Sequence, residues 1–248
     1  MRITVVGALG RMGANVISAA GRSGNDCVAY VDCAYGESRR ENEYRRIADV
    51  REDTDVIIDF SFHAVTPEIA EYAAEKKIPV VIATTGHTES ERANIIKAAE
   101  KTAVFYSGNM SIGIAALCET VKKVLSVFEN ADVEIIETHH NRKLDAPSGT
   151  ALMLLDAVKE VRPDAWANCG RSGSGKRDKN EVGIASVRSG NIVGIHEVHI
   201  CTDCEQITLK HEAYDRALFA DGAIKAAEYI LGKDPGLYDM KALMSCSR

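Results

Sequence analysis

The stretch from His139 to Ala151 holds the residues of this chain that are best suited to chemistry. It contains two adjacent histidines, an arginine and a lysine, and it leads through Ser148-Gly149-Thr150 into an apolar helical segment. Cationic side chains beside free N–H groups at a helix N-terminus bind small anions, most naturally a carboxylate. The stretch therefore predicts a site for a small acidic molecule. A solvated basic loop is the simpler alternative.

Histidines also bind metals, so a metal site is an alternative. No third or fourth ligand lies at finger-like spacing from His139 and its neighbour. A better candidate set on paper is His196, His199, Cys201 and Cys204. These residues fall in an expected strand and its turn, and alternation along a strand points the two histidines of the set to opposite faces. We therefore expect no metal.

A glycine-rich turn near the N-terminus predicts a nucleotide cofactor. The chain opens with an apolar strand that runs into Gly7, Gly10 and Gly13 and then into a helix. Glycines let the backbone turn tightly and approach a pyrophosphate, whose charge faces the helix N-terminus. Asp32 ends the next expected strand, about 20 residues on, where an acid binds the ribose hydroxyls of a dinucleotide. A purely structural turn is the alternative.

Short polar segments close three further expected strands. Ligands of open parallel sheets bind beyond the carboxyl ends of the strands, so such segments together would form a rim. Any one of them alone is better explained by ordinary turn chemistry. The segments are Phe60-Ser61, Ala83-Thr84-Thr85-Gly86 and Ser107-Gly108-Asn109-Met110.

Composition limits the class of protein. The chain has 248 residues, 46% hydrophobic and 27% charged, which is the balance of a soluble globular protein with one large domain or two modest ones. Its net charge is -6 without a long basic block, so we expect no nucleic-acid partner. No apolar run approaches the ~20 residues of a membrane span, and the N-terminus lacks the features of a signal peptide. Seven cysteines without framework spacing indicate reduced thiols in a cytoplasm.

The first half of the chain alternates apolar strands with helices. Continuous apolar strands are typical of a parallel sheet covered on both faces, so this rhythm predicts a doubly wound α/β domain. Thr66 is expected as an N-cap with Pro67 at the first helical position. The expected strands are 3–6, 27–31, 56–60, 79–83 and 103–106, the expected helices begin at 12, 67 and 89, and residues 37–46 fit a loop.

The second half has another pattern, which predicts a mixed or antiparallel sheet with helices on one face. Two alternating strands are expected to be joined by a turn at Ser189-Gly190-Asn191. The expected helices are 112–128, one starting at Ser148, and 219–231; the strands are 131–138, 184–188, 192–201 and 206–211, with a loop over 170–179. We expect a dinucleotide domain over 1–110, a substrate-binding and oligomerisation domain over 111–216, and a C-terminal return over 217–248.

Taken together, these motifs resemble the dihydrodipicolinate reductases, now called 4-hydroxy-tetrahydrodipicolinate reductases. The resemblance covers essentially the whole chain. It implies a cytoplasmic enzyme of lysine and diaminopimelate biosynthesis that uses NADH or NADPH to reduce a cyclic dicarboxylate to tetrahydrodipicolinate with release of water. It also implies a Rossmann-like domain, an open mixed sheet and a homotetramer. The residues that carry it are Val5 to Gly13, Ala83 to Gly86, Glu137 to His140, Lys143 to Ala151, Arg188 to Gly194 and Phe219 to Ala223.

The resemblance also implies roles for individual residues. His139 would be the general acid or base and Lys143 the proton donor, while His140 would contact a substrate carboxylate. Backbone N–H groups of Ser148, Gly149 and Thr150 would hold the second carboxylate. The implied cofactor-binding residues are Gly7, Ala8, Leu9, Gly10, Arg11, Met12, Asp32, Ala83, Thr84, Thr85, Ser107, Gly108, Asn109 and Met110.

The chain departs from the family pattern at a few positions. Arg142 stands where a second histidine is frequent, and Ala83 replaces a frequent glycine. Cys33 follows Asp32, where members that use NADPH well often carry arginine. We therefore expect NADH to serve at least as well as NADPH. The arginines that remain as possible partners of a 2′-phosphate are Arg11, Arg39 and Arg40.

Two other functions remain open at this point. A homoserine or aspartate dehydrogenase would share the glycine turn, but it would not need His139, His140 and Lys143. A dinucleotide-sensing regulator would need a DNA-binding helix pair and a basic face, and neither is visible in the sequence. Binding of pyridine-2,6-dicarboxylate, a planar substrate mimic, would distinguish a dipicolinate-type reductase from both.

Overall fold

The computed structural model describes residues 1–36 and 40–245. The chain forms two compact units. The first comprises Met1–Ile112 and Arg216–Arg248, and the second comprises Gly113–Asp215. Within the described ranges, no helix is long and apolar enough to cross a membrane.

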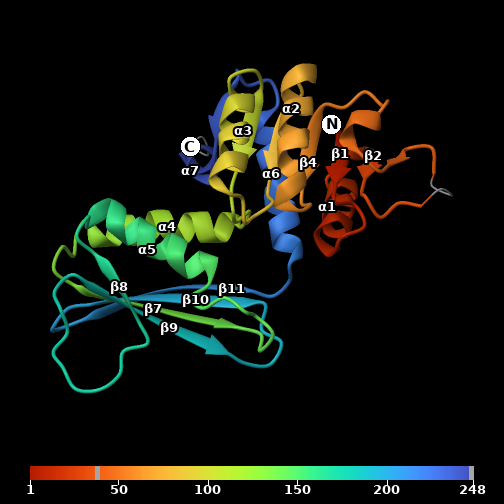
Figure 1. Ribbon diagram of the computed structural model, residues 1–248. Coiled ribbons are helices and arrows are strands. Elements are labelled where there is room, and N and C mark those ends of the chain that lie inside the picture. The colour runs from red at the N-terminus through yellow and green to blue at the C-terminus, as the bar shows by residue number, and fades with distance from the viewer. Residues whose placement is uncertain (37–39, 246–248) are drawn as a thin grey trace. The chain divides into compact units, whose positions relative to one another are not determined.

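A seven-stranded parallel sheet forms the centre of the first unit (Figure 1). Its order is β12-β6-β5-β4-β1-β2-β3. Its inner strands consist of apolar, largely β-branched residues with almost no exposed surface, as expected for strands buried on both faces. The strands are β1 (Arg2–Val6), β2 (Asp26–Val31), β3 (Glu43–Tyr44), β4 (Val56–Asp59), β5 (Val80–Ile82), β6 (Ala103–Tyr106) and β12 (Gly236–Tyr238).

Helices cover this sheet on both faces. From β1 the chain proceeds through α1 (Arg11–Arg22) to β2 on one side, whereas from β4 it proceeds through α2 (Thr66–Lys76) and α3 (Glu89–Ala99) in the opposite direction. Because such crossovers are right-handed, this reversal puts α1 on the opposite face from α2 and α3. Helix α6 (Ala217–Ile230) packs beside α1. The reversal lies between β1 and β4, and the carboxyl ends of these strands border the ligand crevice of such folds. The predicted Rossmann-like fold is confirmed.

Two local predictions for this unit need correction, and two elements were not predicted. Val65, not Thr66, is the N-cap of α2, and the Thr66 hydroxyl donates to Asp59 Oδ2 at 3.2 Å. The buried Asp59 carboxylate competes successfully for that hydroxyl. Residues 37–46 are not all loop, because β3 extends the sheet edge beside β2; residues 37–39 lie outside the described residues. The strand β12 and the short helix α7 (Met240–Ser245) had no strong periodicity and were not predicted.

A five-stranded mixed sheet forms the second unit, as predicted. Its order is β11-β10-β7-β9-β8. Helices α4 (Ile112–Leu125) and α5 (Gly149–Val161) lie on one face, and no other described element of this unit covers the other face (Figure 1). The strands are β7 (Asp132–His139), β8 (Trp166–Cys169), β9 (Glu181–Arg188), β10 (Gly194–Cys201) and β11 (Gln206–Ala213).

The turn at Ser189-Gly190-Asn191 does not make a hairpin of β9 and β10. Strand β7 lies between them, parallel to β9 and antiparallel to β10. The alternation of apolar residues predicted both strands but could not show which strand pairs with which. Strand β8 was missed because it is a short, partly exposed edge strand.

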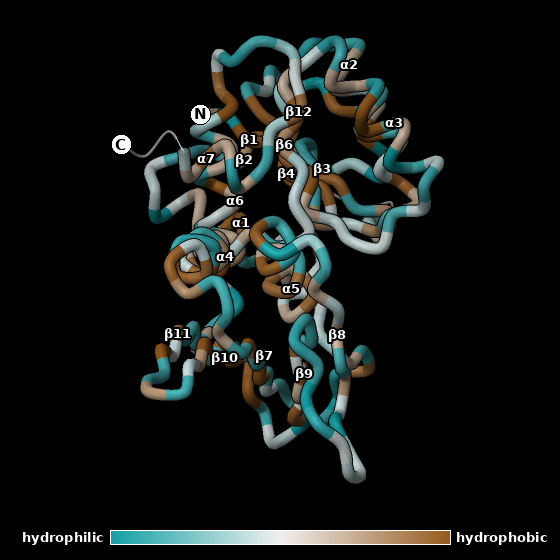
Figure 2. The backbone as a smooth tube through the Cα atoms, turned by 90° about the vertical axis from the view of Figure 1, so that its left-hand side faces the viewer, coloured by the Kyte–Doolittle hydropathy of each residue, from teal (hydrophilic) through white to brown (hydrophobic). Residues whose placement is uncertain are grey.

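The two units have separate cores. One core of the first unit gathers residues of α2, α3 and the sheet, such as Ile69, Ile95 and Val104. The core of the second unit includes Leu125, Ile135 and Leu154 between its sheet and helices. Figure 2 shows hydrophobic colour along the central strands β1 and β4, and these strands are almost fully buried.

Candidate functional site

A buried glutamate on β7 organises the predicted anion site of the second unit. Side chains alternate along β7, so Val133, Ile135, Glu137 and His139 share the face that packs on the helices. Glu137 has no exposed surface and His139 is only 8% exposed. A charged carboxylate in such a place needs close partners, because burial without them is very costly.

Glu137 has close partners from several segments of the unit. Its Oε2 lies 2.5 Å from Nδ1 of His139. The Arg188 guanidinium contacts both carboxylate oxygens, at 2.9 and 2.7 Å. The backbone N–H of Ser148 donates to Oε1 at 3.1 Å. These contacts connect β7, the end of β9 and the start of α5 around one carboxylate.

The protonation of the pair follows from these contacts. Burial alone would raise the pKa of Glu137, but hydrogen bonds from Arg188, Ser186 and His139 outweigh it and lower the pKa to about 2. Burial lowers the pKa of His139, although Glu137 opposes this effect. An ionised carboxylate can only accept hydrogen bonds, so Nδ1 of His139 carries the hydrogen and its Nε2 remains available for a proton.

Ser148 begins α5 and links it to β10. Its side-chain oxygen caps the helix by accepting from the Ala151 N–H at 3.2 Å, and it lies 3.2 Å from Nε2 of His196. His196 stands beside Glu137 in the β7–β10 register, and burial lowers its pKa to about 4, which keeps its ring neutral at pH 7. Since the Ser148 N–H is donated to Glu137, Gly149 and Thr150 carry the next N–H groups of the helix start.

Lys143 lies in the loop that joins β7 to α5. Its Nζ is 2.9 Å from Oδ1 of Asp145, and its side chain is about one-fifth exposed. Arg188 donates to the Asp145 carbonyl at 2.6 Å, which ties the same loop to Glu137. The backbone N–H of His140 donates to Ile192 O at 2.8 Å. His139, Lys143 and Ser148 thus belong to one connected loop and strand end.

Glu137 and Arg188 were not predicted as site residues. Glu137 is a charged residue that follows the apolar Val133 and Ile135 on the inward face of β7, and this is the signal that could have identified it. No local sequence pattern marks Arg188 as a site residue. Only the pairing of β7 with β9 brings it beside His139. His196, one of the four candidate metal ligands, lies on the buried side of β10, opposite His199, as alternation predicted. The part of the chain that the structure describes contains no group of three or more metal-type ligands.

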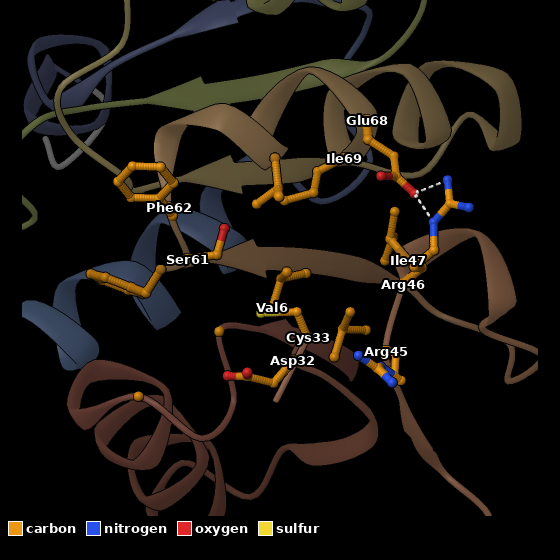
Figure 3. Close-up of a pocket in the computed structure, with 15 residues that line it drawn as sticks. Val6, Asp32, Cys33, Arg45, Arg46, Ile47, Ser61, Phe62, Glu68 and Ile69 are labelled. Carbon is orange, nitrogen blue, oxygen red and sulfur yellow. Dashed lines mark hydrogen bonds and ion pairs between the residues drawn. The ribbon is translucent and has the colours of Figure 1, made fainter. Parts of the chain in front are cut away.

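A pocket of about 460 Å³ lies in the first unit at the reversal between β1 and β4 (Figure 3). It collects the ends of β1, β2 and β4, the segment after β3, and the start of α2. Of the predicted cofactor residues, Gly7, Gly10 and Asp32 line it. The lining residues are Val6, Gly7, Gly10, Val31, Asp32, Cys33, Arg45, Arg46, Ile47, Phe60, Ser61, Phe62, Val65, Glu68 and Ile69.

The glycines of the turn leave no room for side chains. Gly7 has a φ of +79°, and a Cβ there would lie 2.6 Å from the Phe60 carbonyl oxygen. A Cβ on Gly13 would lie 2.2 Å from the Gly7 carbonyl oxygen. The backbone of the turn after β1 therefore lies close to Phe60 and to α1, and the turn leads into the N-terminus of α1 beside the pocket. This cradle fits the diphosphate of a dinucleotide.

Asp32 closes the pocket on the β2 side. Its Oδ2 accepts from the Leu9 N–H at 3.1 Å, and its Oδ1 accepts from the Ala34 N–H at 3.0 Å. A carboxylate offers about four acceptor positions, so two remain for ribose hydroxyls. The site fits a nicotinamide dinucleotide.

The other predicted cofactor residues lie at the same edge of the sheet without lining this pocket. Ala83 and Thr84 follow β5 and are buried, whereas Thr85 is exposed. After β6, Ser107 and Asn109 form a compact turn in which the Ser107 hydroxyl donates to Asn109 O at 2.8 Å. The remaining residues are Ala8, Leu9, Arg11 and Met12 at the glycine turn and the start of α1, and Gly108 and the buried Met110 after β6.

Comparison with known proteins identifies relatives over the whole chain. Residues 1–110 match the family model of dihydrodipicolinate reductase, N-terminus, and residues 113–244 match that of dihydrodipicolinate reductase, C-terminus. A 4-hydroxy-tetrahydrodipicolinate reductase of Caldanaerobacter subterraneus subsp. tengcongensis is 46% identical over 203 residues, 81% of each chain. One from Clostridium novyi is 40% identical over 242 residues, 96% of each chain.

Solved structures agree on the fold. A dipicolinate-bound dihydrodipicolinate reductase from Paenisporosarcina sp. TG-14 superposes with a TM-score of 0.79 at 22% identity, covering 96% of this chain and 97% of that one. An aspartate dehydrogenase from Thermotoga maritima superposes with a TM-score of only 0.53 at 14% identity. Because both family models match in order and together span nearly every residue, the chain belongs to the dihydrodipicolinate reductase family.

Proposed function

We propose that this protein reduces 4-hydroxy-tetrahydrodipicolinate to tetrahydrodipicolinate in lysine and diaminopimelate biosynthesis. One substrate molecule, one NADH or NADPH and one proton give the product, the oxidised cofactor and one water. The observation that carries the proposal is the buried Glu137–His139 pair at the start of α5, in a chain of this family. The bound dipicolinate of the Paenisporosarcina relative, a planar dicarboxylate, supports a ligand of this class.

His139 and Lys143 are proposed to manage the protons of the reaction. When bound, the nicotinamide cofactor supplies a hydride. Lys143 Nζ, held by Asp145, donates the proton that neutralises the charge left on the ring. His139, fixed through Nδ1 by Glu137, accepts or donates a proton at Nε2. Glu137 and Arg188 act as positioning residues, because they orient His139 and the loop.

The carboxylates of the substrate are proposed to bind at the start of α5 and at His140. The N–H groups of Gly149 and Thr150 lie in the first turn of a 13-residue helix, where the helix dipole favours an anion. Ser148 contributes by capping that helix and fixing its start to Glu137. Glu137, Arg188, His139 and His196 are largely enclosed, and charged contacts are stronger in such a site than in water.

The proposed cofactor site is the pocket at the glycine turn. Asp32 would accept hydrogen bonds from both ribose hydroxyls of NADH, whereas a 2′-phosphate would meet its negative charge. Such repulsion costs on the order of 1 kcal/mol or more in a partly dry cleft. We therefore propose that NADH serves at least as well as NADPH.

We also propose that the protein forms a homotetramer through the second unit. A cytoplasmic location is proposed as well, because reducing conditions keep the free thiols reduced. The sheet face without helices carries apolar side chains on neighbouring strands, including Ile136, Val187 and Ile195. A second copy of this chain would cover them. Sedimentation equilibrium measures the assembly, and a monomer at micromolar concentration would contradict this part.

A coupled assay tests the reaction. The purified protein is mixed with dihydrodipicolinate synthase and its two substrates, and loss of nicotinamide absorbance is followed with NADH and with NADPH. We expect oxidation that depends on the synthase and is inhibited by pyridine-2,6-dicarboxylate. No synthase-dependent rate with either cofactor would overturn the assignment and leave another dehydrogenase activity as the alternative.

A further inference from the structure

An arginine that follows the neighbouring strand β3 lies on the side of the cofactor pocket where the residue after Asp32 supplies no charge. Asp32 is followed by Cys33, whose thiol cannot form a bidentate contact with a phosphate. Arg45 lines the same pocket as both residues. Figure 3 shows its guanidinium on the side of the pocket where Asp32 and Cys33 lie.

The pairing of two short strand segments places Arg45 there. Strands β2 and β3 are parallel, with Val31 beside Tyr44, and the Asp32 N–H donates to Tyr44 O at 2.9 Å. Arg45 follows Tyr44 as Asp32 follows Val31, so the two residues leave the carboxyl edge of the sheet side by side. Arg45 is 13 positions from Asp32 in the sequence, so no local motif marks it as a partner of a phosphate.

The other arginines of this region are engaged or do not line the pocket, and Arg11 at the start of α1 is among those that do not line it. Arg46 Nε and a terminal guanidinium nitrogen are each 3.0 Å from Glu68 Oε1. Arg40 lies 3.8 Å from Glu43 and does not line the pocket, and Arg39 lies outside the described residues. Arg45 is exposed, and no hydrogen bond or ion pair joins its side chain to another described residue.

We propose that Arg45 binds the 2′-phosphate of NADPH and is the residue that lets this protein use NADPH as well as NADH. This rests on the proposed function, because it takes the pocket to hold a nicotinamide dinucleotide. A guanidinium matches a phosphate with two parallel hydrogen bonds and offsets the charge of Asp32. Cofactor specificity then depends on Arg45, which follows β3, and not on Cys33, the residue after Asp32.

Binding of cofactor fragments tests this without catalysis. Calorimetry with 2′,5′-ADP and with 5′-AMP compares the native protein, Arg45→Gln and the control Arg40→Gln. We expect Arg45→Gln to weaken 2′,5′-ADP about tenfold, equivalent to ~1.4 kcal/mol, and to leave 5′-AMP within about twofold. Arg40→Gln should change neither. In the coupled assay, Arg45→Gln should lower kcat/KM for NADPH and not for NADH.

Three outcomes overturn the proposal: unchanged 2′,5′-ADP affinity in Arg45→Gln, equal weakening of both fragments, or no binding of 2′,5′-ADP to the native protein. Failure of the proposed reaction looks different. In that case no cofactor is oxidised in the coupled assay, while Arg45→Gln still loses 2′,5′-ADP selectively. If both cofactors are used and Arg45→Gln retains NADPH, the reaction stands and the role of Arg45 is wrong.

Discussion

Nδ1 of His139 lies 2.5 Å from Oε2 of Glu137, two residues earlier on the same inward face of β7. The pairing depends on the two-residue repeat of a strand, which puts both side chains into one row. It fixes which ring nitrogen of His139 faces the protein and which remains for chemistry.

Loss of either proposed proton-handling group should mainly affect turnover. We expect His139→Gln and Lys143→Ala to lower kcat by roughly 10²–10⁴-fold, the range for a positioned acid or base. Thr150→Pro removes one of the proposed carboxylate-binding N–H groups in the first turn of α5, where proline is tolerated. It should mainly raise KM, because a carboxylate anchor binds ground and transition states alike. The coupled assay measures both, with the exposed Lys159→Ala as control. Near-native kcat in both of the first two variants, with intact circular dichroism, would show the roles to be wrong.

Glu137 should control the protonation of His139. Its carboxylate raises the pKa of His139 against the effect of burial. Glu137→Gln removes this contribution, so we expect the pH at which activity declines on the acid side to move to lower pH, together with a lower kcat. The measurement is kcat/KM from pH 5 to 9. A lower rate with an unshifted profile would mean that Glu137 serves stability alone.

The same carboxylate should make stability depend on pH. The pKa of Glu137 is lowered from 4.5 to about 2, so its contribution is fully present above about pH 4.5 and is lost as the pH falls toward 2. A shift of this size corresponds to on the order of 3 kcal/mol. We expect Glu137→Gln to be destabilised at pH 7 and to approach the native protein as the pH falls. Urea unfolding at pH 7, 4.5 and 3 measures this, and a pH-independent difference would contradict it.

Room beside His139 depends on a glycine of β10. A Cβ on Gly194 would lie 3.1 Å from Nε2 of His139, so the ring has to move by a few tenths of an ångström. We expect Gly194→Ala to lower kcat about tenfold, since small misplacements of a catalytic group are costly. Gly175→Ala is the matched control, because no atom lies within 4 Å of its Cβ position. Equal activity of the two variants would argue against a role for Nε2 of His139.

The preference between NADH and NADPH should depend on the charged side chains at the end of β2. With Asp32 in place, we expect kcat/KM for NADH to be at least equal to that for NADPH at one ionic strength. Cys33→Arg should raise kcat/KM for NADPH, because it adds a second guanidinium beside the 2′ position. A native preference for NADPH beyond about tenfold, ~1.4 kcal/mol, would show that the ribose lies elsewhere.

The sequence by itself determined the class of each unit. Continuous apolar strands such as β4 and β6, separated by helices, predicted the parallel sheet, and the glycine spacing after β1 predicted the turn. These are local signals: periodicity records which faces are buried, and glycine records where a Cβ does not fit. The resemblance at His139, Lys143 and Ser148 indicated the family for the same reason, since these residues are close in sequence.

Only the tertiary structure decided which distant segments meet. Placing β7 between β9 and β10 brings Arg188 to Glu137 and His196 to Ser148, although the turn after β9 had suggested a hairpin. The two-residue strand β3 likewise brings Arg45 beside Asp32. Strand order depends on burying whole faces against α4 and α5, a global balance that no short window of sequence contains.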